Sequence, residues 1–156
     1  ANVMAGYWEL PEETAKCLKP GLLPGERVLH TGDLFRMDEE GFLYFVARKD
    51  DIIKCRGEKV SPKEIENVLY SLDGILEAAV FGVPDRILGQ AIKACVSLEH
   101  GSKLTEKDIM RHCARHLESF MLPKHVEIRD SLPKTVTGKI SKKELTAPHT
   151  TEGVHA

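Results

Sequence analysis

Lys139 is the residue best suited to do chemistry, because it follows a glycine in a short segment with little conformational freedom. Gly138 permits a tight turn, and Pro133, Thr135 and Thr137 restrict the backbone before it. A loop of this kind holds an ammonium group outward at small entropic cost. A cation held there would stabilise the charge that builds on a transferring phosphoryl group. The spacing alone favours a solvated surface lysine, since Lys134, Lys142 and Lys143 lie close by in the sequence.

A second candidate is Asp33, which follows Thr31 and Gly32 at the end of a run of strand-forming residues. A carboxylate in that position can accept hydrogen bonds from two vicinal hydroxyl groups, such as those of a ribose. Three residues are a weak signal, and Asp33 also fits a turn or capping aspartate before Leu34.

Further candidates lie between residues 48 and 58, where Arg48 and Asp50 precede the turn at Arg56 and Gly57. Asp50 fits a polar linker position, for which Asp51 is equally eligible. Gly57 fits an ordinary hairpin turn, although only glycine would let another molecule pass so close to the backbone.

Three segments, residues 30–34, 48–66 and 132–140, resemble the C-terminal part of the acyl-adenylate-forming enzymes in their order and spacing. That superfamily includes acyl- and aryl-CoA synthetases, peptide-synthetase adenylation domains and luciferases. The Lys54–Pro62 stretch is more similar to acyl- or aryl-CoA ligases. The one departure is Ala47 before Arg48, where the family usually has Gly-Arg.

The resemblance implies a role for each candidate residue. Lys139 matches the catalytic lysine that bridges the substrate carboxylate and ATP, and Asp33 and Arg48 match the site for the AMP ribose. Asp50 matches the hinge about which the C-terminal domain rotates. Gly57 matches the glycine that lines the pantetheine channel, and Lys54 matches a lysine that faces the reaction centre in thioester formation.

The function implied by the resemblance is that of an ATP-dependent ligase joining a carboxylic acid to the thiol of CoA through acyl-AMP, with release of pyrophosphate and AMP. ATP, CoA and Mg²⁺ would act with the whole enzyme, and Mg²⁺ would not bind to this chain. Two alternatives stay open. One is an adenylation domain that loads a carrier-protein thiol, and the other is a non-catalytic module that binds nucleotide or protein.

The sequence predicts an α+β fold, with a small mixed sheet and two or three packed helices. We expect residues 1–47 to be the β-rich tail of a larger N-terminal adenylate-binding domain, because one hairpin and one short helix cannot bury a core. Residues 48–51 would form the hinge, residues 52–145 the C-terminal lid domain, and residues 146–156 a flexible tail. Because the first methionine is Met4, we expect an experimental piece or a proteolytic remnant, inactive alone.

Local patterns predict the individual elements. A short helix is expected over residues 12–18, and strands over 27–35, 41–46, 52–55, 58–60, 75–83, 90–98 and 125–129. Ser61 with Glu64, and Thr105 with Asp108, predict capping boxes at the start of two helices. A last helical turn is expected over residues 141–145.

Composition and residue spacing argue against nucleic-acid binding, membrane association and metal binding. The 22 basic and 24 acidic residues nearly cancel, so we expect neither nucleic-acid binding nor attraction to an anionic membrane. No apolar run is long enough to span a bilayer, and four scattered cysteines without a CxxC pair predict a reduced, cytoplasmic protein. His112 and His116 lie one helical turn apart but have no third ligand nearby, so no metal site is expected.

Overall fold

The computed structural model describes residues 3–146, which divide into two compact units between Asp50 and Asp51. This division falls inside the predicted hinge segment, residues 48–51. The rotation expected at that segment stays a prediction. The polar tail predicted for residues 146–156 lies outside the described residues, apart from Thr146 itself.

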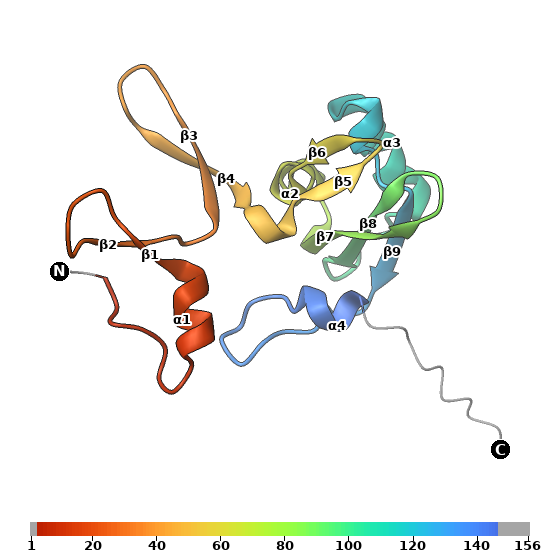
Figure 1. Cartoon of the computed structure of the whole chain (residues 1–156). Helices are drawn as coiled ribbons and strands as arrows, with labels where there is room; N and C mark the ends of the chain where they lie inside the picture. The colour runs from red at the N-terminus through yellow and green to blue at the C-terminus, as the bar shows by residue number, and fades with distance from the viewer. Residues whose placement is uncertain (1–2, 147–156) are drawn as a thin grey trace. The chain divides into compact units, whose positions relative to one another are not determined.

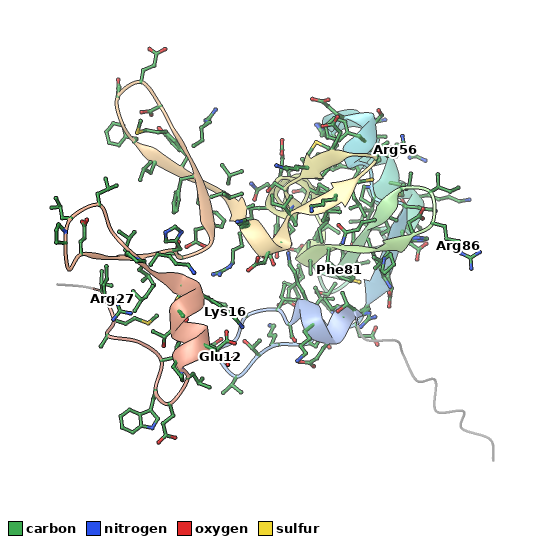
Figure 2. The ribbon with its side chains drawn as sticks, in the orientation of Figure 1. Glu12, Lys16, Arg27, Arg56, Phe81 and Arg86 are labelled. Atoms are coloured by element: carbon green, nitrogen blue, oxygen red, sulfur yellow. The ribbon has the colours of Figure 1, made fainter. Side chains whose placement is uncertain are left out.

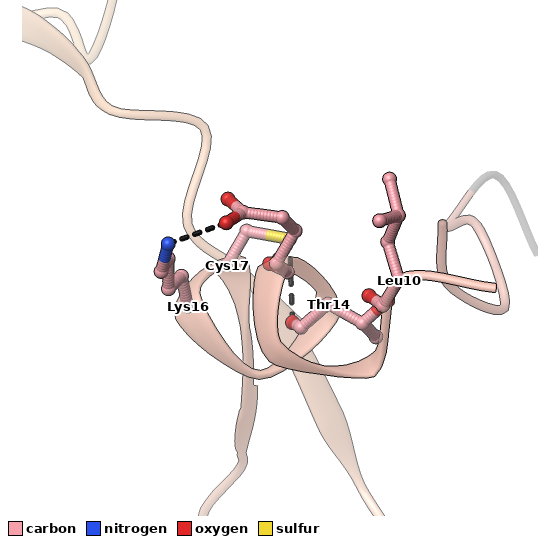
Figure 3. A network of polar contacts seen from close by, with 5 residues as sticks. Leu10, Thr14, Lys16 and Cys17 are labelled. Carbon is pink, nitrogen blue, oxygen red and sulfur yellow. Dashed lines mark hydrogen bonds and ion pairs between the residues drawn. The ribbon is translucent and has the colours of Figure 1, made fainter. Parts of the chain in front are cut away.

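The first unit combines one short helix with two separate pairs of antiparallel strands. Its elements are α1 (Pro11–Cys17), β1 (Leu18–Pro20), β2 (Arg27–Leu29), β3 (Asp33–Met37), β4 (Leu43–Arg48) and the start of the 3₁₀ turn η1 (Lys49–Asp51). Helix α1 begins with a proline in its first turn, a position where the missing N–H is not needed. Figure 3 shows the ion pair that Lys16 makes with Glu13 in α1. The Thr14 hydroxyl donates a hydrogen bond to the carbonyl of Leu10, the residue before the helix.

The single strand predicted over residues 27–35 is wrong, because the chain turns at residues 30–32. Gly32 has a φ of +78°, a conformation that favours glycine and ends β2 before β3 begins. Strand β2 pairs with β1, which the sequence did not predict, and β3 pairs with β4 as the predicted hairpin requires. The break leaves Asp33 as the first residue of β3.

The first unit buries very little. Within its described residues only Leu18 and Ala47 are buried, at 5% and 2% exposure. Phe35, Phe42 and Phe45 are each half exposed or more. Large apolar side chains in such number normally lie inside a core or an interface. The packing therefore agrees with the expectation that this unit completes a larger domain.

The second unit contains one mixed sheet and its helices. Its elements are β5 (Ile53–Cys55), β6 (Glu58–Val60), α2 (Pro62–Tyr70), β7 (Ile75–Asp85), β8 (Gly89–Leu98), α3 (Glu106–His116), the 3₁₀ turn η2 (Ser119–Met121), β9 (His125–Arg129) and α4 (Lys142–Thr146). The strand order is β6-β5-β8-β7, and β9 pairs with β8 in parallel (Figure 1). The predicted α+β fold is confirmed.

The main core lies between the sheet and helices α2 and α3. Alternate strand residues such as Val80 and Ile92 pack there against Ile65 and Leu69 of α2 and Ile109 of α3. Each of these side chains is at most 1% exposed, and burying one contributes about 1.5–3 kcal/mol. Helices α2 and α3 therefore stabilise the unit through the faces that carry these residues.

The two predicted capping boxes have different outcomes. At α3, Thr105 and Asp108 exchange both capping hydrogen bonds, as predicted. At α2, Ser61 is the N-cap and Pro62 follows it, but the Ser61 side chain makes no capping hydrogen bond, so the box with Glu64 is wrong. The ψ angle is 118° at Ser61 and 162° at Thr105, so the serine presents its hydroxyl to the first turn in a different direction.

The opposite face of the sheet is covered by the end of the chain. Ala79, Phe81 and Cys95 alternate with the residues of the main core and contact Leu132 and Leu145. Phe81 can be located on β7 in Figure 2. This second, smaller core attaches residues 132–145 to the sheet, and that segment carries Lys139.

Candidate functional site

The β3–β4 hairpin brings Asp33 and Arg48 together, next to the turn between β2 and β3. The two residues are directly opposite each other at the ends of β3 and β4. Arg48 Nη1 lies 3.6 Å from Asp33 Oδ1, and Arg48 Nη2 donates a hydrogen bond to the Thr31 carbonyl at 3.1 Å. A side chain at Gly32 would have its Cβ 3.5 Å from the same guanidinium. The turn therefore orients the arginine and leaves the carboxylate 27% exposed.

Asp33 and Arg48 line an open cleft of about 1050 Å³ in the first unit. The Lys, Arg, His and Asp side chains that line it are Lys16, Lys19, His30, Asp33, Arg48, Lys49 and Asp50. Basic groups outnumber acidic ones in this wall. A cleft with this lining suits an anionic ligand that also carries hydroxyl groups, which are the two features of a nucleotide.

The predicted thiol-site residues lie on the β5–β6 hairpin in the second unit. Arg56 and Gly57 form its turn, with φ angles of 54° and 85°, and two positive values are typical of a type I′ turn. A Cβ added to Gly57 would meet no other atom within 4 Å, so space is open above this glycine. Figure 2 labels Arg56 at the end of the hairpin. Lys54 is exposed on β5, two residues before Arg56.

The hairpin is held to the rest of the sheet by a few polar contacts. The Lys54 N–H donates to the Gln90 side chain at 2.8 Å, and the Arg56 N–H donates to the Leu88 carbonyl at 3.1 Å. Cys55 pairs with Gly89 of β8. Gln90 was not among the predicted site residues, since its contact with Lys54 joins positions that are far apart in the sequence.

A cavity of about 330 Å³ lies beside this hairpin and was also not predicted. Its walls include Arg56, Leu88, Phe120 and Lys124, which come from three separate segments. Nothing in the local sequence of any one segment signals it.

The Lys139 loop, residues 133–140, is closed by its own hydrogen bonds. The Thr135 N–H donates to the Lys139 carbonyl at 2.7 Å, and the Gly138 N–H donates to the Thr135 carbonyl at 2.9 Å. Lys134 and Ile140 form a β-bridge at the base. Within residues 3–146 no hydrogen bond or ion pair involves the Lys139 ammonium group, whereas Lys134 and Lys142 are both paired with carboxylates. Lys139 is thus the lysine that this loop presents to solvent.

The candidate residues form three groups rather than one. Asp33, Arg48 and Asp50 belong to the first unit, with Asp50 at the boundary. In the second unit, the β5–β6 hairpin forms one end of the strand order β6-β5-β8-β7, whereas the loop before α4 belongs to the segment that packs on the Phe81 face of the sheet. Lys139 and Gly57 therefore face different surroundings.

The part of the chain from residue 3 to residue 146 has no group of three or more His, Cys, Asp or Glu side chains that could hold a metal ion. The His112 and His116 rings are tilted by 48° with centroids 4.5 Å apart, and His112 Nε2 lies 3.0 Å from the hydroxyl of Ser71, the C-cap of α2, so His112 connects α3 to the end of α2. No described helix is both long and apolar enough to cross a bilayer.

Comparison with known proteins identifies the family. Residues 64–139 match the model of the AMP-binding enzyme C-terminal domain. The chain belongs to the acyl-adenylate-forming enzymes and carries their C-terminal domain. The resemblance to this family is confirmed by this match together with the similar proteins described below, which cover 91–93% of the chain.

The similar curated proteins are CoA ligases. The chain is 44% identical to a long-chain-fatty-acid–CoA ligase of Yersinia pestis, over 92% of this chain and 24% of that protein. It is 43% identical to a crotonobetaine/carnitine–CoA ligase of Salmonella arizonae, over 92% of this chain and 27% of that protein. The chain thus spans about a quarter of the length of the curated relatives it matches.

Solved structures agree with these matches. ATP-bound MatB from Rhodopseudomonas palustris is 32% identical with a TM-score of 0.82, over 93% of this chain and 28% of that chain. The amide bond synthetase McbA from Marinactinospora thermotolerans is 34% identical with a TM-score of 0.79, over 91% of this chain and 28% of that chain. Both likenesses cover the two units described above.

Proposed function

We propose that this chain is the C-terminal part of an AMP-forming ligase that joins a carboxylic acid to the thiol of CoA. The full-length enzyme would convert the acid and ATP into acyl-AMP and pyrophosphate, and then exchange AMP for the thiol. The observation that carries the proposal is the exposed, unpaired Lys139 on a closed loop, in a chain 44% identical to a named CoA ligase. The domain that completes the site would be the N-terminal one, outside this chain.

Lys139 acts in the first half-reaction. Its ammonium group approaches the carboxylate and the α-phosphate, where negative charge builds as the new acyl–oxygen–phosphorus link forms. Asp33 accepts hydrogen bonds from the ribose hydroxyls, and its partly exposed carboxylate in the basic cleft fits that task. Arg48 holds the turn of that site and adds positive charge beside the nucleotide.

The β5–β6 hairpin acts in the second half-reaction. Gly57 leaves open space for the pantetheine arm, and Lys54 faces the reacting centre. Asp50 lies at the unit boundary, where a change of a few φ and ψ angles would exchange one arrangement for the other. Mg²⁺ is expected at the nucleotide phosphates in the full-length enzyme, since the described residues contain no cluster to hold it.

The thiol acceptor follows from the relatives. Several are named CoA ligases, which favours free CoA over the carrier-protein thiol that stays as the alternative. Relatives named for quite different acids match at 42–44% identity, so this part of the enzyme does not select the acid. A cytoplasmic location also remains a prediction.

The test separates the two half-reactions in the full-length enzyme. Lys139→Ala should slow acid-dependent exchange of labelled pyrophosphate into ATP by about 10²–10³-fold, because it removes one preorganised charge from the transition state. Thioester formation from supplied acyl-AMP should change less than about twofold. Lys143→Ala, another exposed lysine of the same segment, is the matched control. Equal losses in both half-reactions for Lys139→Ala would contradict the proposal.

A second arm identifies the acceptor. Free CoA and a phosphopantetheinylated carrier protein are supplied separately with acyl-AMP. Thioester on CoA supports the ligase, whereas transfer to the carrier protein alone supports the adenylation-domain alternative. No pyrophosphate exchange by the full-length enzyme with any acid would favour a non-catalytic module.

A further inference from the structure

Two carboxylates hold the two ends of the Lys139 loop. At the start of the loop, Glu77 of β7 contacts the Lys134 ammonium group, with Glu77 Oε1 2.7 Å from Lys134 Nζ. The same carboxylate accepts a hydrogen bond from the Leu132 N–H, and Ser97 Oγ lies 3.4 Å away. The pKa of Glu77 is lowered, with Lys134 as the largest cause. Glu77 thus joins the start of the loop to two strands of the sheet.

The other end of the loop is held from a helix. Glu66 of α2 is 9% exposed, and its Oε1 atom lies 2.9 Å from Lys142 Nζ. The same oxygen accepts a hydrogen bond from the Val80 N–H of β7 at 3.0 Å. One buried carboxylate oxygen therefore connects α2, β7 and the residue that begins α4.

The apolar contacts of the segment do not fix the loop in the same way. Leu132, Ile140 and Leu145 pack on the second face of the sheet, but apolar contact is non-directional. Residues 134–139 themselves are exposed, and the Val136 side chain contacts nothing that shields it from solvent. Directional contacts at the ends are what can set the direction of the loop.

We propose that Glu77 and Glu66 are positioning residues for Lys139, which clamp the loop from both sides so that its ammonium group is held ready for adenylation. The inference rests on the proposed role of Lys139. Its physical basis is that misplacing a catalytic group by about 1 Å lowers the rate by up to about 10²-fold. Neither carboxylate contacts substrate in this proposal, since each acts through a lysine of the loop segment.

A purely structural role for these ion pairs is the competing explanation, and the chain offers a matched control. Glu127 of β9 is also paired with two cations, Lys93 and Arg129, but it has no contact with the loop segment. Glu127→Gln removes a comparable ion pair from the same sheet. A merely structural role predicts that Glu127, Glu77 and Glu66 behave alike.

The first experiment measures loop order without any catalysis. Backbone ¹⁵N relaxation measures the order parameter of the Lys139 N–H in the 156-residue chain. We expect about 0.8, near the value for rigid backbone, in the unchanged chain. In the double variant Glu77→Gln/Glu66→Gln the order parameter should fall below about 0.6. Glu127→Gln and Lys134→Arg, which keeps a donor for Glu77, should match the unchanged chain. Lys134→Gln and Lys142→Gln remove the same ion pairs from their more exposed partners, so the test stands if a glutamate variant fails to fold. An unchanged order parameter in the double glutamate variant, in Lys134→Gln and in Lys142→Gln overturns the clamp.

The second experiment connects the clamp to the reaction in the full-length enzyme. Glu77→Gln and Glu66→Gln should each lower kcat for pyrophosphate exchange about tenfold, with KM for ATP within about twofold, while thioester formation from acyl-AMP is spared. Lys139→Ala reports separately on the proposed function. If Lys139→Ala slows exchange but both glutamate variants do not, only the clamp is wrong. If Lys139→Ala has no effect, the proposed function fails, while the order parameters still decide whether the carboxylates clamp the loop.

Discussion

Asp33 and Arg48 face each other at the ends of β3 and β4, with Arg48 Nη1 3.6 Å from Asp33 Oδ1. They are fifteen positions apart in the sequence, and the hairpin brings them to one wall of the cleft. The guanidinium donates a hydrogen bond to the Thr31 carbonyl, so it offsets part of the negative charge of the Asp33 carboxylate without covering it. A carboxylate that is placed but still accessible can bind a pair of hydroxyl groups.

Asp33→Ala should remove recognition of the ribose. The unchanged full-length enzyme is expected to have a KM for 2′-deoxy-ATP at least about tenfold above its KM for ATP, because a site built to bind a hydroxyl discriminates against its loss. In Asp33→Ala the two KM values should differ by less than about twofold. Steady-state pyrophosphate exchange with both nucleotides measures this, and each enzyme serves as its own control. A variant that still prefers ATP tenfold would show that the ribose is recognised elsewhere.

Gly57→Ala tests the thiol channel. The φ of 85° makes any side chain there unfavourable by about 1–2 kcal/mol, but its Cβ would meet no atom of this chain within 4 Å. Thioester formation from acyl-AMP should therefore fall at least about tenfold, because the methyl group enters the path of the pantetheine arm, while pyrophosphate exchange stays within about twofold.

Gly101→Ala is the control for that experiment. Gly101 has a φ of 83° in the same unit, and an added Cβ there also meets nothing within 4 Å. It brings the same backbone strain without a predicted role in catalysis. If both alanine variants lose thioester formation to the same degree, strain explains the loss and the channel does not.

Local sequence patterns predicted the parts of the fold that depend on neighbouring residues. The turn at Arg56 and Gly57 and the cap at Thr105 follow from a few adjacent side chains, and both are present. The pairing of β1 with β2 was missed, because Leu18–Pro20 is too short to show a period of two. The break at Gly32 was missed because the residues on either side of it favour strands.

The candidate site was predictable only where a motif lies in one segment. Lys139 and its glycine are adjacent, so the sequence signalled them. Glu77 and Glu66 are more than fifty residues from the loop that they hold, and each looks like an ordinary solvated carboxylate in its own strand or helix. Folding alone brings them to Lys134 and Lys142. Contacts of this kind need coordinates, since neither partner carries a local signal.

Stability at acid pH should depend on Glu127. Hydrogen bonds from Arg129 first, and from Lys93 second, lower the pKa of this carboxyl to about 2 from its usual 4.5. Because the folded-state pKa is the lower one, its stabilisation is fully present above about pH 4.5 and is lost as the pH falls from 4.5 towards 2. The side chain is 33% exposed, so solvent screening limits the effect to about 1 kcal/mol.

Glu127→Gln should therefore lower the free energy of unfolding at pH 7 by up to about 1 kcal/mol and leave it nearly unchanged at pH 2. Urea unfolding followed at several pH values measures both. Glu118→Gln, an exposed carboxylate without a capping contact, should leave the pH dependence as it is. A Glu127→Gln variant with the full acid sensitivity of the unchanged chain would show that its ion pairs do not contribute.

Leu69→Ala tests the main core under α2. Leu69 is 0% exposed and packs in the core between the sheet and α3, so its truncation leaves a cavity that the surrounding residues cannot fill. The expected loss is about 2–5 kcal/mol in the free energy of unfolding.

Val68→Ala is the control for that experiment. Val68 directly precedes Leu69 in the same helix but is only partly buried, so its truncation should lower the free energy of unfolding by about 1 kcal/mol or less. Urea unfolding measures both losses. If the slope of the unfolding free energy against urea concentration is unchanged, each loss is a change in the stability of the folded state. Equal losses at the two positions would mean that Val68 packs as deeply as Leu69, against the orientation that α2 has in this structure. The clamp at Glu66 would then lose its support, because it depends on the same helix orientation.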